Sequence, residues 1–132
     1  ETGHLILSTL HTIGAANTID RVIDAFPPGQ QQQIRTQLSM VLDAVISQQL
    51  IPTLDGGVQP AFEVMFLNNA IRNMIRESKI HQIDGVIATS QGEGMISMDN
   101  SIISLYRKGA ISRENAIAYS SNSELMAKKL DR

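Results

Sequence analysis

The 132-residue sequence contains no cysteine, which excludes a disulfide framework and a thiolate zinc site. Its formal net charge is only −2, so it lacks the basic excess of a nucleic-acid-binding protein or an anionic-membrane anchor. No apolar run approaches the roughly 20 residues of a membrane-spanning helix. The N-terminus has neither the basic start nor the small-residue cleavage site of a signal peptide. These absences favour a cytoplasmic protein with no direct membrane insertion and no nucleic-acid partner.

The phosphate-binding motif G-x-x-x-x-G-K-[ST] is also missing. The nearest glycine-rich stretch, Gln91–Gly94, has two glycines and no lysine. No Ser–His–acid triad or catalytic carboxylate pair can be assigned from spacing. The chain alone therefore lacks the main equipment for holding a nucleotide phosphate. Because the sequence opens without Met inside an apolar stretch, we expect a piece of a longer protein that continues upstream of Glu1.

The first third of the chain predicts one strand and two helices. Its 42% hydrophobic content is enough to bury a core. His4–His11 is apolar and partly β-branched, which predicts a buried strand. Thr12 is the expected N-cap of a helix that runs from Ala15 until Pro27–Gly29 stops it. A second helix with a wide apolar stripe is predicted over about Gln31–Leu50.

The remainder predicts a hairpin and then only helices. The hairpin covers Leu50–Phe66, with Asp55–Gly57 at the turn, where positive φ angles are needed. We therefore expect an α/β fold in which few strands are followed by a helical tail, divided into a core at 1–67 and a helical part at 68–132. The expected helices run from a cap at Asn68 or Asn69 to about Lys79, within Lys79–Thr89, from Met98 to Lys108, from Ser112 to about Tyr119, and onward from a Ser121–Glu124 capping box.

Thr9, His11 and Thr12 lie between the predicted first strand and the first helix, a place where α/β proteins bind ligands. A helix N-terminus, hydroxyls and an imidazole can together donate hydrogen bonds to an anion. The residues alone support a functional and a structural role equally. His4 lies on the opposite face of an unbroken strand, roughly 23 Å from His11 at about 3.3 Å per residue. The two histidines therefore do not share a metal, and His4 by itself favours a structural role.

The stretch AIRNMIRE places two arginines, Arg72 and Arg76, on one face of a predicted helix. Apolar side chains occupy the opposite face. A solvated basic face is the plain explanation, and a surface that grips a partner or a neighbouring subunit is the functional alternative. The stretch comprises Ala70, Ile71, Arg72, Asn73, Met74, Ile75, Arg76 and Glu77.

Three stretches, in order and covering nearly the whole chain, resemble the type II/IV secretion ATPase superfamily. ETGHLILSTLHTIGAANTIDRVIDAFP is similar to its histidine box, although Ile13-Gly14 replaces a more usual polar pair. AIRNMIRE is similar to the signature of type IV pilus retraction ATPases, with Met74 in place of a common Leu. MISMDNSIISLYRKGAISRENAIAYSSN resembles the helical tail of the same ATPases.

The resemblance implies the C-terminal part of a RecA-like P-loop ATPase domain from a cytoplasmic homo-hexameric motor. Such a motor hydrolyses ATP with Mg²⁺ and drives pilus retraction and twitching motility. It acts at the cytoplasmic face of the inner membrane on proteins of the pilus base. The Walker A, acidic-box and Walker B segments are implied upstream, where most of the ATP and Mg²⁺ is bound. This chain alone is then expected to be inactive and to hold no metal.

The same resemblance assigns roles to residues. It implies that His4 and His11 lie near the nucleotide and are needed for activity. His11 is then expected to sense the γ-phosphate, with Thr9 and Thr12 as supporting donors. The Ala70–Glu77 helix is implied to couple hydrolysis to neighbouring subunits or to the pilus base.

Two alternatives stay open on the sequence alone. One is a related type II secretion or pilus assembly ATPase, which the AIRNMIRE stretch disfavours. The other is a nonenzymatic interaction module that binds a partner through the face of Arg72 and Arg76.

Overall fold

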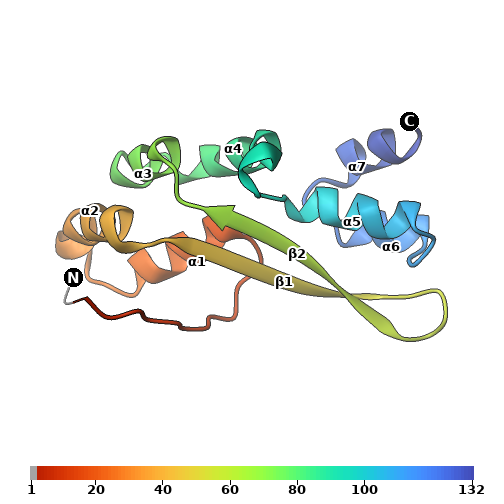
Figure 1. Cartoon of the computed structure of the whole chain (residues 1–132), viewed down its shortest axis with the longest axis horizontal. Coiled ribbons are helices and arrows are strands. Elements are labelled where there is room, and N and C mark those ends of the chain that lie inside the picture. The colour runs from red at the N-terminus through yellow and green to blue at the C-terminus, as the bar shows by residue number, and fades with distance from the viewer. Residues whose placement is uncertain (1–2) are drawn as a thin grey trace.

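A computed structural model describes residues 3–132 and shows one long antiparallel hairpin with helices packed along it (Figure 1). Strand β1 (Ala44–Pro52) pairs with β2 (Val58–Phe66) in an unbroken ladder from Ala44–Phe66 to Pro52–Val58. The helices are α1 (Ala15–Asp24), α2 (Gln31–Val41), α3 (Asn69–Arg76), α4 (Ile83–Thr89), α5 (Met98–Arg107), α6 (Arg113–Ala118) and α7 (Ser123–Leu130), with short 3₁₀ turns at Pro28–Gln30, Ile80–Gln82 and Gln91–Glu93.

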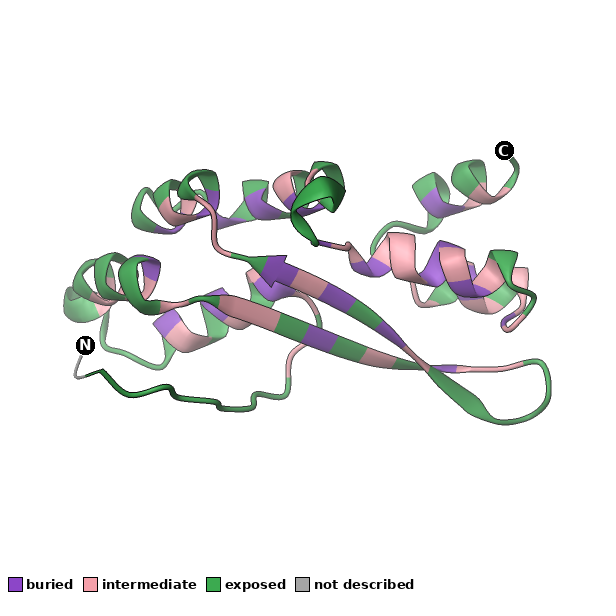
Figure 2. Cartoon of the chain, in the orientation of Figure 1, coloured by how far each residue is buried: buried purple, intermediate pink, exposed green. Residues whose placement is uncertain are grey.

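The two faces of the hairpin differ in burial, as the alternating colours in Figure 2 show. Successive side chains of a strand point to opposite faces, so every second residue is covered by helices. Ile51, Ala61 and Met65 on the covered face are fully buried. Ile46 and Phe62 on the other face are exposed. The helices thus form one layer against a single face of the sheet.

The buried apolar residues form two cores, one at each end of the hairpin. The first core packs α1, α3 and α4 against the end of β2 at Met65. The second core packs α5, α6 and α7 against Ile51 and Ala61, nearer the turn. Figure 1 shows the same division, with α1–α4 toward one end and α5–α7 toward the other. The first core comprises Ala15, Ile19, Ile23, Met65, Ile71, Ile75, Ile80, Ile83, Ile87 and Met95, and the second Ile51, Ala61, Met98, Ile102, Ile103, Leu105, Ile111, Ala116 and Met126.

The predicted strand over His4–His11 is wrong for this structure. Residues 4–10 have no regular secondary structure and run as an exposed extended segment (Figure 1). A strand exists only when a neighbour pairs with its backbone. Within residues 3–132 the sheet contains β1 and β2 alone, and neither pairs with this segment. The first two residues of the histidine-box match, Glu1 and Thr2, lie outside the described residues.

The second predicted helix is correct only to Val41. Leu42 adopts an extended conformation, and the strand β1 begins at Ala44 rather than at Leu50. The apolar residues of this stretch fit helical spacing, but Val45, Ser47 and Ile51 also share one face of a strand. The hydrogen-bonded pairing with β2 makes this stretch a strand and not a helix. The hairpin and its turn at Asp55–Gly57 are confirmed, with a first strand that begins earlier than predicted and a second strand that ends at Phe66 as predicted.

Two of the predicted helix caps are present in the structure, and one is replaced by a neighbouring residue. Asn68 and Ser112 cap α3 and α6, each accepting a backbone N–H bond, which confirms both expectations. α3 ends three residues earlier than expected, because Ser78 adopts a positive φ of 60°. Ser121 does not cap α7: Asn122 does so, and Ser121 instead bonds the Asp99 carboxylate.

The predicted cap at Thr12 is also wrong. Gly14 occupies the N-cap position of α1 with a φ of 92°. The hydroxyl of Thr12 instead lies 2.6 Å from that of Thr18. The start of α1 therefore takes its partners from elsewhere in the chain.

Two glycine-to-alanine substitutions are expected to act in opposite directions. Gly56 holds a φ of 87° in the hairpin turn, so Gly56→Ala should lower the free energy of unfolding by about 1 kcal/mol. Gly85 lies within α4, where an added Cβ meets no atom within 4 Å, so Gly85→Ala should raise it by roughly 0.5–1 kcal/mol. Urea unfolding of the two variants beside the parent protein checks both, and changes of the same sign would contradict the assigned backbone conformations.

Candidate functional site

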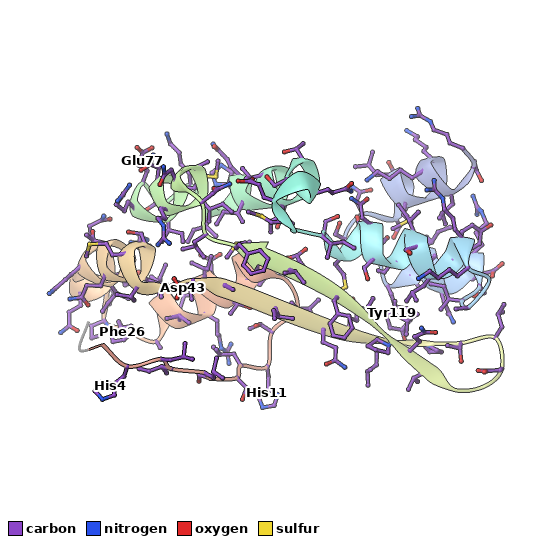
Figure 3. All side chains as sticks on the ribbon, viewed as in Figure 1. His4, His11, Phe26, Asp43, Glu77 and Tyr119 are labelled. Carbon is purple, nitrogen blue, oxygen red and sulfur yellow. The ribbon has the colours of Figure 1, made fainter. Side chains whose placement is uncertain are left out.

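The histidine segment, residues 4–12, lies on the outside of the molecule beside α1. His4 and His11 are both exposed, and Figure 3 shows their rings pointing away from the hairpin. Thr9 is exposed and Thr12 half-buried. Leu5, Ile6 and Leu7, in the same segment, are 83%, 79% and 87% exposed. The four predicted sensing residues thus lie along one extended stretch before α1, with His4 and His11 well apart from each other (Figure 3).

The start of α1 is held by two buried side chains of the hairpin. The backbone N–H of Gly14 donates to Ser47 Oγ at 2.7 Å, and that of Ala15 donates to Glu63 Oε1 at 2.7 Å. The first N–H groups of a helix have no partner within it, and a carboxylate there also interacts favourably with the helix dipole. Residues of β1 and β2 thus position the helix that follows the histidine segment.

The second oxygen of Glu63 holds another helix. Oε2 accepts a hydrogen bond from the backbone N–H of Met98, the first residue of α5, at 3.1 Å. Sequence reasoning missed Glu63, although a signal was present: it is a lone acidic residue on the apolar face between Ala61 and Met65. Charged side chains at such positions are rarely buried without a specific partner.

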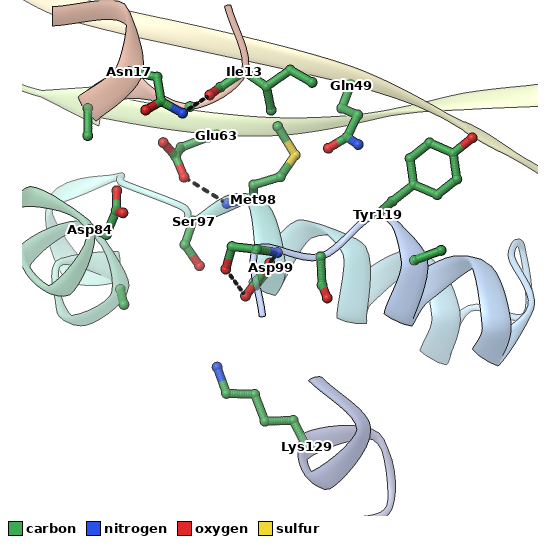
Figure 4. A pocket seen from close by; sticks show the side chains of 16 residues that line it. Ile13, Asn17, Gln49, Glu63, Asp84, Ser97, Met98, Asp99, Tyr119 and Lys129 are labelled. Carbon is green, nitrogen blue, oxygen red and sulfur yellow. Dashed lines mark hydrogen bonds between the residues drawn. The ribbon is translucent and has the colours of Figure 1, made fainter. Parts of the chain in front are cut away.

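A cleft of about 510 Å³ opens between the start of α1, the hairpin, α4, α5 and α7 (Figure 4). Three carboxylates line it, from Glu63, Asp84 and Asp99, and Lys129 lies across from them. Burial raises the pKa of the Asp84 carboxyl, and the charge of Asp99 raises this pKa further. Asp99 accepts from both the N–H and the hydroxyl of Ser121. Since like charges gather here, the cleft is unsuited to a polyphosphate.

The described residues offer no metal site and no membrane span. Among residues 3–132, no group of three His, Cys, Asp or Glu side chains is placed to hold a metal ion. In the same part of the chain, no helix is both long and apolar enough to cross a bilayer.

The two arginines of the AIRNMIRE helix have different surroundings. Arg72 Nη1 donates to the backbone carbonyls of Ser39, Met40 and Leu42 at 2.6, 3.4 and 3.3 Å, where α2 ends. These are carbonyls that a helix leaves without an internal partner, so Arg72 caps α2. The side chain of Arg76 is exposed and donates within its own helix, to the side chain of Asn73.

The other members of the stretch divide as their spacing predicts. Ile71 and Ile75 are fully buried, and Met74 is half-buried against the first core. Ala70 and Asn73 face solvent with Arg76. Glu77 is exposed and forms a 2.8 Å ion pair with Lys79, whose hydrogen bond and charge lower the pKa of the Glu77 carboxyl. The exposed surface of the AIRNMIRE stretch therefore consists of Ala70, Asn73, Arg76 and Glu77.

Comparison with known proteins matches residues 1–121 to the family described as "Type II/IV secretion system protein". A twitching motility protein of Neisseria gonorrhoeae is 50% identical over 128 residues, covering 96% of this chain and 34% of that protein. The type IV pilus retraction ATPase PilT of Pseudomonas aeruginosa is 49% identical over 116 residues, covering 88% of this chain and 34% of that protein. The chain thus spans about a third of the length of these relatives.

A solved structure of the pilus retraction motor PilT with bound ADP resembles the fold. It superposes with a TM-score of 0.82 at 40% sequence identity, over 95% of this chain and 35% of the PilT chain. The match confirms the predicted fold class, an α/β arrangement of few strands and a helical tail equivalent to part of a motor ATPase.

Substituting the two arginines is expected to separate their structural contributions. Arg72→Met should lower the free energy of unfolding by about 1–2 kcal/mol, because the last carbonyls of α2 lose a charged donor. Arg76→Met, the matched control on the same helix, should change it by less than about 0.5 kcal/mol. Urea unfolding measures both, and equal losses would contradict the capping role of Arg72.

Proposed function

The chain belongs to the type II/IV secretion system protein family, and we propose that the full-length protein is a PilT-like motor ATPase that drives type IV pilus retraction and twitching motility. The observation that carries this proposal is the likeness to the ADP-bound retraction motor, at 40% identity over 95% of the chain. A related secretion or pilus assembly ATPase is the alternative within the family. The AIRNMIRE stretch and the twitching and retraction names of the relatives favour retraction.

The nucleotide and its Mg²⁺ are held mainly by the part of the protein outside this chain. Two features support this assignment: the chain has no P-loop motif, and it spans about a third of its relatives. The acidic cleft repels phosphate, whereas the histidine segment presents an accessible imidazole and a threonine hydroxyl. The exposed Leu5–Leu7 run then becomes a strand when the rest of the ATPase domain pairs with it.

His11 responds to the γ-phosphate by donating a hydrogen bond, and Thr9 and Thr12 supply supporting donors. His4 lies near the nucleotide at the other end of the same segment. Because α1 starts directly after these residues, a shift of the segment moves the start of α1. The core at 1–67 carries the sensing part, and the helical part at 68–132 carries the output.

The output surface is the exposed face of α3. Arg72 is occupied by α2, so Arg76, with Ala70, Asn73 and Glu77, remains to contact other molecules. These residues couple hydrolysis to neighbouring subunits of a homo-hexamer or to pilus-base proteins. The hexamer works in the cytoplasm, at the inner face of the inner membrane.

The sensing role is tested by His11→Ala in the full-length protein. ATP turnover should fall by about tenfold or more, because a donor to the transferred phosphate is lost. The hexamer should persist in size-exclusion chromatography. His81→Ala is the control, since His81 is exposed in a 3₁₀ turn outside the histidine segment. Normal turnover by His11→Ala would remove the sensing role.

The coupling role is tested by Arg76→Ala. Retraction, scored as twitching motility, should be lost to a greater extent than basal ATP hydrolysis, because Arg76 is exposed and supports no other element with its side chain. Twitching zones and ATP turnover are measured on the same variant. An equal loss of both activities would argue against coupling through this face.

A further inference from the structure

A buried polar layer separates the two cores of the molecule. Ser47 on β1 lies directly opposite Glu63 on β2, and they are only 4% and 6% exposed. Along the covered face of β2, Met65 belongs to the first core, Ala61 to the second, and Glu63 stands between them. This is the one carboxylate among residues 3–132 that the structure buries.

We propose that Glu63 is a positioning residue that couples the histidine segment to helices α5–α7 of the second core. Its carboxylate, with the amides of Ala15 and Met98, forms what we term the Glu63 joint. This inference rests on the proposed function, because it assumes that the histidine segment responds to nucleotide.

The joint links segments that are far apart in sequence. Glu63 is 48 residues from Ala15 and 35 from Met98. One oxygen accepts from α1, which follows the histidine segment, and the other accepts from α5, the first helix of the second core. Because the two oxygens belong to one rigid group, a shift of the start of α1 pulls on the carboxylate and, through its other oxygen, on the start of α5.

The joint requires a carboxylate of this length. Both partners are N–H donors, so two acceptor oxygens are needed. A glutamine offers one oxygen and one NH₂ group, which would face an N–H donor and leave it unpaired. An aspartate keeps the charge, but it is one methylene shorter and loses reach to one of the two amides.

Hydrogen exchange of the full-length hexamer tests the coupling. The nonhydrolysable ATP analogue AMP-PNP, with Mg²⁺, should change exchange in the parent at residues 14–18 and at 97–101. In Glu63→Gln the response at 14–18 should persist and the response at 97–101 should disappear. A retained response at 97–101 in this variant overturns the joint, as does a parent that responds at 14–18 alone.

Kinetics give a second readout that a purely structural role would not move. Glu63→Gln should lower kcat by about tenfold while leaving KM for ATP within about twofold, because coupling rather than nucleotide binding is lost. Glu93→Gln is the matched control, since Glu93 is exposed and accepts only from the Asn68 side chain. A parallel rise in KM overturns the positioning role.

The outcomes separate this inference from the function on which it rests. A parent hexamer that neither binds AMP-PNP nor hydrolyses ATP refutes the proposed ATPase, and the joint falls with it. A parent that hydrolyses ATP without a response at 97–101 refutes the joint alone. If Glu63→Gln fails to fold, Glu63→Asp takes its place with the same expected results, and the measurement on the parent can still overturn the joint.

Discussion

A single buried carboxylate, that of Glu63, joins the two halves of this molecule. Burying a charge is costly unless donors surround it, and here the donors are backbone amides at the starts of two helices. Both amides would otherwise lack partners, since the first N–H groups of a helix have none within it. The Glu63 carboxylate and the two backbone amides thus provide each other with hydrogen-bond partners. These bonds also fix the positions of the starts of α1 and α5 on the hairpin.

The two faces of the hairpin have different surroundings. One face is covered by helices, and the other carries exposed apolar side chains such as Ile46, Leu50 and Phe62. The histidine segment is likewise apolar and exposed. Surfaces of this kind are normally covered by other parts of a protein. A chain that spans about a third of its relatives is expected to leave such surfaces for the remaining two thirds to cover.

Local chemistry made much of this fold predictable from the sequence. The caps at Asn68 and Ser112 and the turn at Gly56 depend on neighbouring residues, and the structure confirms them. The predictions failed where contacts with residues distant in the sequence determine the local structure. The stretch after Val41 fits helical and strand spacing alike, and only pairing with β2 makes it a strand. Glu63 went unnoticed because its partners lie 48 and 35 residues away. The isolated predicted strand at His4–His11 had no neighbour within the described residues.

The contacts of Arg72 join α3 to α2. α2 and α3 run side by side and are fastened at both ends: Arg72 bonds the last carbonyls of α2, and Gln32, near the beginning of α2, donates to the carbonyl of Arg76 at 3.0 Å. The two helices are therefore held together as one rigid unit. Any displacement of Arg76 therefore also displaces Met40 and Val41, which are exposed at the opposite end of α2.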